Sequence, residues 1–93
     1  MISGDYNVAM GTLSLSADTT GNKSTAIGYG ALNLQNVTNG ADMFNTAVGF
    51  SAGAAVTTGQ LNTLIGSLTG DALTVGTYNV AVGASALSTD TKG

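Results

Sequence analysis

The chain has 93 residues, of which 8% are charged and 43% are hydrophobic, and its formal net charge is -3. A chain of this length holds one small domain or a single run of stacked units. The charged residues are five aspartates and two lysines, so the sequence has no basic patch that could neutralise nucleic-acid phosphates or anionic lipids. We therefore expect no nucleic-acid binding, and no membrane insertion, because no apolar stretch approaches the ~18 residues of a membrane helix.

Several residue types that carry chemistry are missing from the sequence. Without cysteine the chain forms no disulfide and no thiolate metal site. Histidine, glutamate and arginine are also absent, so acid-base work would fall to Asp, Lys, Tyr or a terminus. We expect a non-enzyme without a cofactor. Because a soluble surface normally carries roughly a quarter charged residues, we also expect partner chains to cover part of this one.

A pattern N-x-A-φ-G, in which φ is a large aliphatic residue, recurs five times along the chain. The copies are NVAMG (7–11), STAIG (24–28), NTAVG (45–49), NTLIG (62–66) and NVAVG (79–83). Their final glycines are 17, 21, 17 and 17 residues apart, which is a period of 17 with one four-residue insertion. Such a fixed period is typical of stacked repeat proteins. The β-branched residues and the frequent glycines favour strands over helices.

In chain order, this period predicts five coils, at about 4–20, 21–39, 40–58, 59–75 and 76–93. Each coil should contain a motif strand, a turn, a short extended segment and a Thr-rich turn that ends on a second glycine. Turns that need a positive φ angle explain the glycines better than a phosphate-binding loop does. Between the second and third coils, the four extra residues are split around Gly40 and predict a protruding turn that leaves the strands in register.

The fold class that follows is all-β, a parallel β-solenoid (β-roll) that forms a single repeat domain over 1–93. One 17-residue unit cannot bury a face alone, whereas stacked units pair their backbones with the coils above and below. The chain stops without a polar capping unit, so we expect it to be a fragment of a longer fibre. MISGDYN is not a secretion signal, and an extracellular location would depend on that longer parent.

Both sides of each predicted strand are apolar. The Ala or Leu of the motif alternates with the large aliphatic residue that follows it, so the two sets of side chains point to opposite faces. The large aliphatic residues could fill the coil interior while alanine allows a neighbouring chain to approach closely, but the pattern does not decide which set faces inward. A solitary solenoid would present a polar outer face. The second apolar face therefore predicts a parallel homo-oligomer, and we expect a homotrimer.

The five motif copies resemble the head repeats of trimeric autotransporter adhesins and, more closely, the NTAVG-type repeats of phage tail-fibre and virion appendage proteins, over nearly the entire chain. The resemblance implies a left-handed parallel β-roll that assembles as a trimer. Its structural repeat positions would be Asn7, Gly11, Ser24, Gly28, Asn45, Gly49, Asn62, Gly66, Asn79 and Gly83. The 17-residue period is longer than the usual adhesin head repeat, and the Thr-Thr-Gly tail is similar to phage-fibre sequences.

The function expected from this resemblance is a structural shaft or spacer segment of a trimeric extracellular fibre, a phage tail fibre of the virion surface that takes part in host attachment. The alternative is a head segment of a bacterial trimeric autotransporter adhesin on the bacterial outer surface. Expected partners are further copies of the chain, neighbouring fibre domains and, through other domains, a host-surface glycan or protein.

Few residues qualify as catalytic or metal-binding candidates. Lys23 and Ser24 form a formal Ser-Lys pair, but neighbours on a strand face opposite ways, so we expect a solvated lysine beside a repeat-column serine. The aspartates are dispersed and form no D-x-D pattern, so no metal site is expected. Asp18 and Asp90 share a repeat position four units apart; a ring on a trimer axis is the alternative to a turn-stabilising role. The aspartates are Asp5, Asp18, Asp42, Asp71 and Asp90.

The insertion supplies a weak candidate binding loop, because inserted loops often carry contacts. Its residues are Asn39, Asp42, Met43 and Phe44. For Phe44, packing against the solenoid flank is the alternative. Tyr29 and Phe50 share a repeat position and predict a packing ladder more than a ligand platform. The repeated Asn and Ser positions predict a ladder that satisfies turn backbone groups rather than a glycan-binding strip.

An ice-binding solenoid is a further alternative, because such proteins also combine low charge with regularly spaced threonines. Its candidates would be Thr25, Thr46 and Thr63. Val8 and Val80 interrupt that series, which weakens this interpretation.

Overall fold

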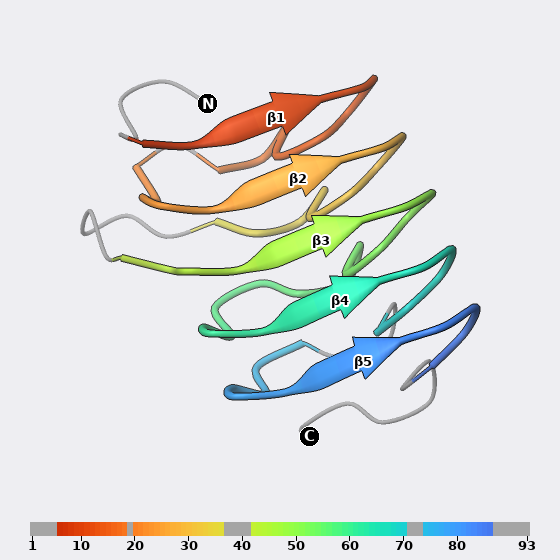
Figure 1. The fold of residues 1–93 in the computed structure, drawn as a ribbon. Coiled ribbons are helices and arrows are strands. Elements are labelled where there is room, and N and C mark those ends of the chain that lie inside the picture. Colours follow the sequence, from red (N-terminus) through yellow and green to blue (C-terminus); the bar gives the residue numbers. More distant parts are fainter. Residues whose placement is uncertain (1–5, 19, 37–41, 71–73, 87–93) are drawn as a thin grey trace.

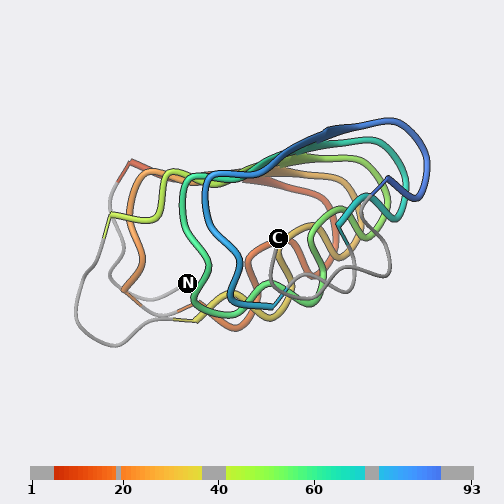
Figure 2. The same cartoon turned by 90° about the horizontal axis from the view of Figure 1, so that it is seen from below.

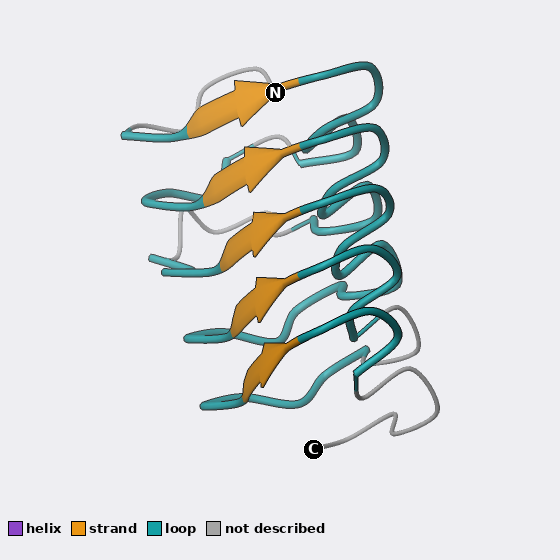
Figure 3. Cartoon of the chain, turned by 45° about the vertical axis from the view of Figure 1, so that its right-hand side comes forward, coloured by secondary structure: helices purple, strands orange, loops and turns teal. Residues whose placement is uncertain are grey.

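The computed structural model describes residues 6–18, 20–36, 42–70 and 74–86. The described residues contain five strands of three residues each: β1 (Val8–Met10), β2 (Thr25–Ile27), β3 (Thr46–Val48), β4 (Thr63–Ile65) and β5 (Val80–Val82). They form one parallel sheet in chain order (Figure 1). After each strand the chain runs back behind the sheet to the start of the next, as Figure 3 shows, so the fold is a β-solenoid of about four turns. The predicted parallel β-solenoid is confirmed, and the described residues include no helix.

The strands stay in one register through the whole stack. Thr25 pairs with both Val8 and Thr46, although its separation from Thr46 is 21 residues rather than 17. The insertion therefore leaves the adjoining strands in register, as predicted. The turn expected around Gly40 falls within 37–41, outside the described residues.

From β2 to β5, the Ala or Leu at the centre of the motif strand faces the inside of the coil. Ala26, Ala47 and Leu64 are fully buried, whereas Met10 is 59% exposed and Val82 67% exposed. The possibility that the large aliphatic residues fill the interior is therefore wrong. The physical reason lies in the opposite wall of the coil, which Figure 2 shows facing the sheet along the stack. That wall contributes its own buried side chains to the narrow interior, namely Leu15, Leu32, Ala31, Ala52 and Val56.

Where the structure describes it, the second segment of the coils is a run of turns, so the prediction of a short extended segment there is wrong. In the first coil, the Ser14 N–H donates to Gly11 O, the Ser16 N–H to Leu13 O and the Asp18 N–H to Leu15 O, each at 3.3 Å. Leu13 and Leu15 have φ angles of 64° and 51°. Residues with a left-handed backbone conformation alternate with other residues along this segment. They fold the chain into successive turns, which direct Leu15 into the core.

The two sets of glycines are required for different structural reasons. Gly49 directly follows β3 and has a φ angle of +134°, and a Cβ atom there would lie 2.6 Å from Gly66 O in the next coil. The expected positive φ is thus confirmed for this motif glycine. Gly59, of the second set, is not among the residues with positive φ. A Cβ atom on Gly59 would instead collide with Gly76 O, so close stacking of the coils requires this glycine.

Candidate interaction surface

The repeated asparagines lie inside the coil and link successive coils. The Asn45 side chain donates from Nδ2 to Gly59 O at 2.7 Å and accepts the Asn62 N–H on Oδ1 at 3.0 Å. Asn62 repeats the pattern with Gly76 O at 2.9 Å and the Asn79 N–H at 3.1 Å. Asn45 and Asn62 are buried. The predicted ladder is confirmed for these positions, and they cannot serve as an exposed glycan strip.

Gln35 completes this ladder where Ser24 replaces asparagine, and sequence analysis missed its role. Its Nε2 donates to Asp18 Oδ2 at 2.6 Å and to Ser24 Oγ at 3.2 Å, while its Oε1 accepts from Asn45 Nδ2 at 2.7 Å. Asp18 also accepts the Gly21 N–H at 2.9 Å, so its turn-stabilising role is confirmed. The signal in the sequence was the serine itself, which is too short to reach the partners of an asparagine.

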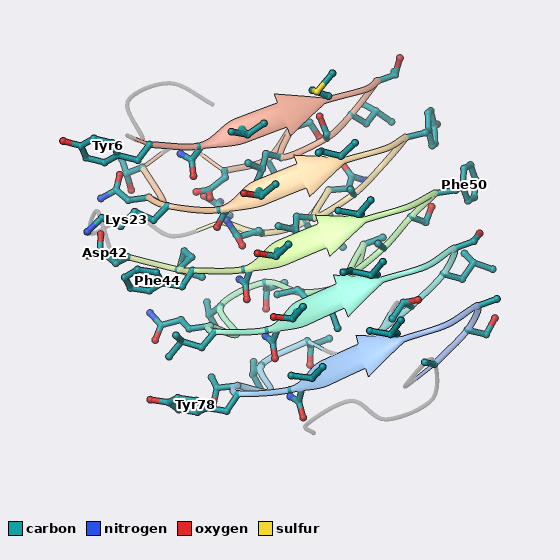
Figure 4. The ribbon with its side chains drawn as sticks, viewed as in Figure 1. Tyr6, Lys23, Asp42, Phe44, Phe50 and Tyr78 are labelled. Carbon is teal, nitrogen blue, oxygen red and sulfur yellow. The ribbon has the colours of Figure 1, made fainter. Side chains whose placement is uncertain are left out.

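The outward side of the sheet is a flat surface without charge, which we call the strand face. Its side chains alternate with the buried column and come from the first and third residue of each strand (Figure 4). These residues are Val8, Met10, Thr25, Ile27, Thr46, Val48, Thr63, Ile65, Val80 and Val82. Three threonines lie side by side on β2, β3 and β4, and every other position is aliphatic. The strand face therefore places the second apolar set of the motif against solvent in the single chain.

Aromatic residues flank the strand face. Tyr29 and Phe50 stack with ring centroids 5.4 Å apart and an interplanar angle of 12°. This contact is the predicted packing ladder, although both rings are about half exposed. Along the opposite edge, Tyr6, Phe44 and Tyr78 project from the coils just before the strands (Figure 4). The apolar surface thus extends beyond the strands on both sides.

An ion pair and an aromatic ring form a small group at that second edge, which we call the edge cluster (Lys23, Asp42 and Phe44). Lys23 Nζ lies 2.9 Å from Asp42 Oδ2 and 5.4 Å from the centroid of the Phe44 ring. The hydrogen bond from Lys23 holds the pKa of the Asp42 carboxyl below its ordinary value of 3.8, and the lysine charge acts in the same direction. The lysine and the carboxylate are both partly exposed.

The described residues of the candidate binding loop lie in different environments. Asp42 and Phe44 are exposed and both contact Lys23, whereas Met43 is fully buried. Asn39 lies outside the described residues. Lys23 and Ser24 face different surroundings, because the lysine reaches Asp42 while the Ser24 hydroxyl accepts from Gln35 inside the coil. Binding by this loop stays a prediction.

Over the described residues we find no group of three potential metal-ligating side chains. Of the aspartates considered for metal binding, Asp5, Asp71 and Asp90 lie outside that part of the chain. No pocket is detected among the described coils. None of the segments that the structure describes is a helix that could span a bilayer.

A comparison of the chain with known protein families, curated proteins and solved structures finds no match.

Proposed function

We propose that the chain is a structural shaft or spacer segment of a trimeric extracellular fibre, of the phage tail-fibre type that takes part in host attachment. The observation that carries this proposal is the uncharged, mostly aliphatic strand face on a coil whose interior is already filled. Burial of apolar surface is favourable by roughly 25 cal/mol per Å², and large exposed apolar patches mark interaction sites. A partner that covers the strand face would gain this free energy.

A second and a third copy of the chain are the partners that fit this surface best. Side chains on the strand face repeat at the strand spacing of about 4.8 Å. A parallel copy presents the same columns at the same spacing, so that ridges and gaps match along the whole stack. The number three and a left-handed coil come from the resemblance to trimeric fibre repeats. Neighbouring fibre domains would continue the shaft, and contact with the host is assigned to other domains.

The backbone arrangement supports a role as a spacer. Each coil is hydrogen-bonded to the next along the strands and also through the turns, as in the bonds from Leu32 N to Ala52 O and from Gly53 N to Thr69 O. Forces along the stack axis are therefore carried by many parallel hydrogen bonds. A stack of this kind keeps its length, which is what a shaft requires.

Sedimentation equilibrium of the 93-residue chain tests the proposal. We expect a species of three times the 9.1 kDa chain mass. Val48→Asp and Ile65→Asp place a charge on the strand face and should reduce the assembly to monomers that keep the far-UV circular dichroism of the parent. Thr58→Asp adds the same charge at an exposed position outside the strands and should leave the trimer intact.

A parent chain that stays monomeric at its highest soluble concentration would overturn the assembly. Folded Val48→Asp and Ile65→Asp variants that still form trimers would show that another surface is used.

A further inference from the structure

One repeat position supplies a column of side chains along the edge of the sheet where the strands begin. It directly precedes the Asn or Ser of each motif copy. Its residues are Tyr6, Lys23, Phe44, Leu61 and Tyr78. All five have similar φ angles, between 54° and 61°. In coils that stack in register, a shared backbone conformation points these side chains in the same direction.

Aromatic residues occupy this position in every second coil. Tyr6, Phe44 and Tyr78 belong to the first, third and fifth coils, and Figure 4 shows them projecting from the same edge. We call these three residues the aromatic row. The backbone at this edge stays in step with the strands, since the Leu61 N–H donates to Met43 O at 2.8 Å. Because adjacent coils are about 4.8 Å apart, the Cα atoms of successive members of the row lie roughly 9.6 Å apart.

The aromatic row is exposed, and the charges beside it are balanced. Tyr6, Phe44 and Tyr78 are 82%, 47% and 78% exposed. Lys23 and Asp42 are the charged residues that the structure describes at this edge, and they pair with each other at 2.9 Å. The balanced pair favours an uncharged ligand over an anionic one. The row also lies on the flank of the stack, so coils added at either end would lengthen this edge and would not cover it.

The spacing of the rings matches a particular class of uncharged polymer. The face of an aromatic ring is electron-rich, and it attracts the weakly positive C–H groups on the face of a pyranose sugar. In an extended β-1,4-linked glycan, alternate sugars turn the same way, and this repeat of two sugars is close in length to the rise of two coils. Every second sugar can therefore stack on one ring of the row. Lys23, Asp42 and the tyrosine hydroxyls offer donors and acceptors to the sugar hydroxyls.

We propose that the aromatic row is a binding site for an extended, uncharged β-1,4-linked glycan that lies along the axis of the stack. The inference goes beyond the proposed function, which assigns contact with the host to other domains. It does not depend on the trimer, because the row lies beside the strand face and not on it (Figure 4).

Isothermal titration calorimetry of the 93-residue chain with oligosaccharides tests the site. We expect binding of cellohexaose or chitohexaose, and the comparison of the two decides whether the sugar is glucose or N-acetylglucosamine. The matching trisaccharide should bind more weakly, because it reaches only two rings. Maltohexaose should not bind, because its α-1,4 linkages curve the chain away from the row. A parent that binds neither β-linked hexasaccharide, or that binds maltohexaose equally well, would overturn the proposal.

Variants of the outer rings test the spacing. Tyr6→Asn and Tyr78→Asn each remove one ring at a φ angle of 60°, which asparagine tolerates. Each should weaken hexasaccharide binding several-fold and change trisaccharide binding much less, since two adjacent rings remain. Tyr78→Phe keeps the ring and should keep most of the affinity. Tyr29→Asn, at a half-exposed tyrosine of the opposite edge, is the matched control and should leave the affinity unchanged.

Two further results would contradict the glycan site. One is an equal effect of Tyr6→Asn, Tyr29→Asn and Tyr78→Asn on hexasaccharide binding. The other is a loss of self-association in sedimentation for the two row variants with unchanged glycan affinity, which would mean that the row contacts another copy of the chain. Val48→Asp, which should disrupt the proposed trimer, should keep the glycan affinity, so failure of the trimer and failure of this site are distinguishable.

Discussion

Each of the buried asparagines Asn45 and Asn62 bonds to two backbone groups of the following coil. Asn62 donates to Gly76 O and accepts the Asn79 N–H while it is fully buried. Because a buried polar group without a partner costs more than an average hydrogen bond gains, the column tolerates few side chains. Where Ser24 occupies the column, a second buried side chain, Gln35, supplies the missing amide.

Replacement of one such amide should destabilise the whole stack. Asn62→Ala leaves Gly76 O and the Asn79 N–H without this partner, and we expect a loss of about 1–3 kcal/mol for each abandoned group. Urea denaturation followed by circular dichroism measures the loss. Thr77→Ala, at an exposed position, is the control and should change stability by less than about 0.5 kcal/mol. A similar small change for both variants would show that the ladder is not important for stability.

The ion pair of the edge cluster should respond to pH in one direction only. Because the folded pKa of Asp42 lies below the ordinary value of 3.8, its contribution to stability is present above that value and is lost as the pH falls through the folded pKa. An NMR titration of the Asp42 carboxyl should give a midpoint below 3.8. In Lys23→Met the midpoint should rise, because the donor of the hydrogen bond is gone. An unchanged midpoint would mean that the pair does not persist in solution.

At the scale of the elements, the large core residue lies on the wall opposite the sheet in the second coil and on the strand in the fourth coil. In the second coil a small Ala26 on the strand accompanies Leu32 on the wall, whereas in the fourth coil Leu64 on the strand accompanies Gly70. A Cβ atom on Gly70 would lie 3.0 Å from Leu64 Cδ2. The second and fourth coils therefore place their large residue on opposite sides of the interior.

A double-mutant cycle at this pair should show strong coupling. Leu64→Ala alone should cost about 2–5 kcal/mol through the cavity it creates, and Gly70→Leu alone should destabilise by overpacking. Together they recreate the arrangement of the second coil, where Leu32 has a φ angle of 51° close to the 62° of Gly70. The double variant should be more stable than the sum of the single effects predicts, by about 0.5–3 kcal/mol. Additive losses in urea denaturation would contradict this exchange of volume.

At the scale of the whole molecule, the size of the strand face limits how tightly copies can bind. Five strands of three residues, about 4.8 Å apart, give a strand face of about 24 by 10 Å, or ~240 Å² in projection. A standard interface buries roughly 800 Å² per partner. A strand face of this size lies toward the weaker end of interfaces, and added coils would strengthen the proposed assembly.

Thermal stability should therefore depend on protein concentration and hardly on salt. In the proposed assembly only folded chains associate, which stabilises the folded state. Tm should therefore rise by several degrees between dilute and concentrated samples. The strand face carries no charge, so moderate added NaCl should leave the assembled fraction nearly unchanged. Calorimetry at two concentrations and sedimentation at two ionic strengths measure these effects. A Tm independent of concentration would contradict assembly of the folded chain.

Much of the fold was predictable from the repeat, and much of the surface was not. The motif copies located all five strands and their register, because equivalent residues must stack when the same 17 residues recur. The Asn ladder followed from burial of polar groups in such a stack. The bond between Gln35 and Asn45 and the contact of Lys23 with Asp42 could not be predicted, since both join the second coil to the third across the insertion, where the period is broken.

The sequence by itself determined that this protein is a parallel stack of coils with apolar residues on both sides of every strand. Only the tertiary structure decided which side is inside. Alternation along a strand separates Ala47 from Val48 but does not say where the chain closes. That choice depends on the opposite wall, whose positive-φ turns direct Leu15 and Leu32 into the space beside the alanines. The larger aliphatic residues are left outside, on the strand face.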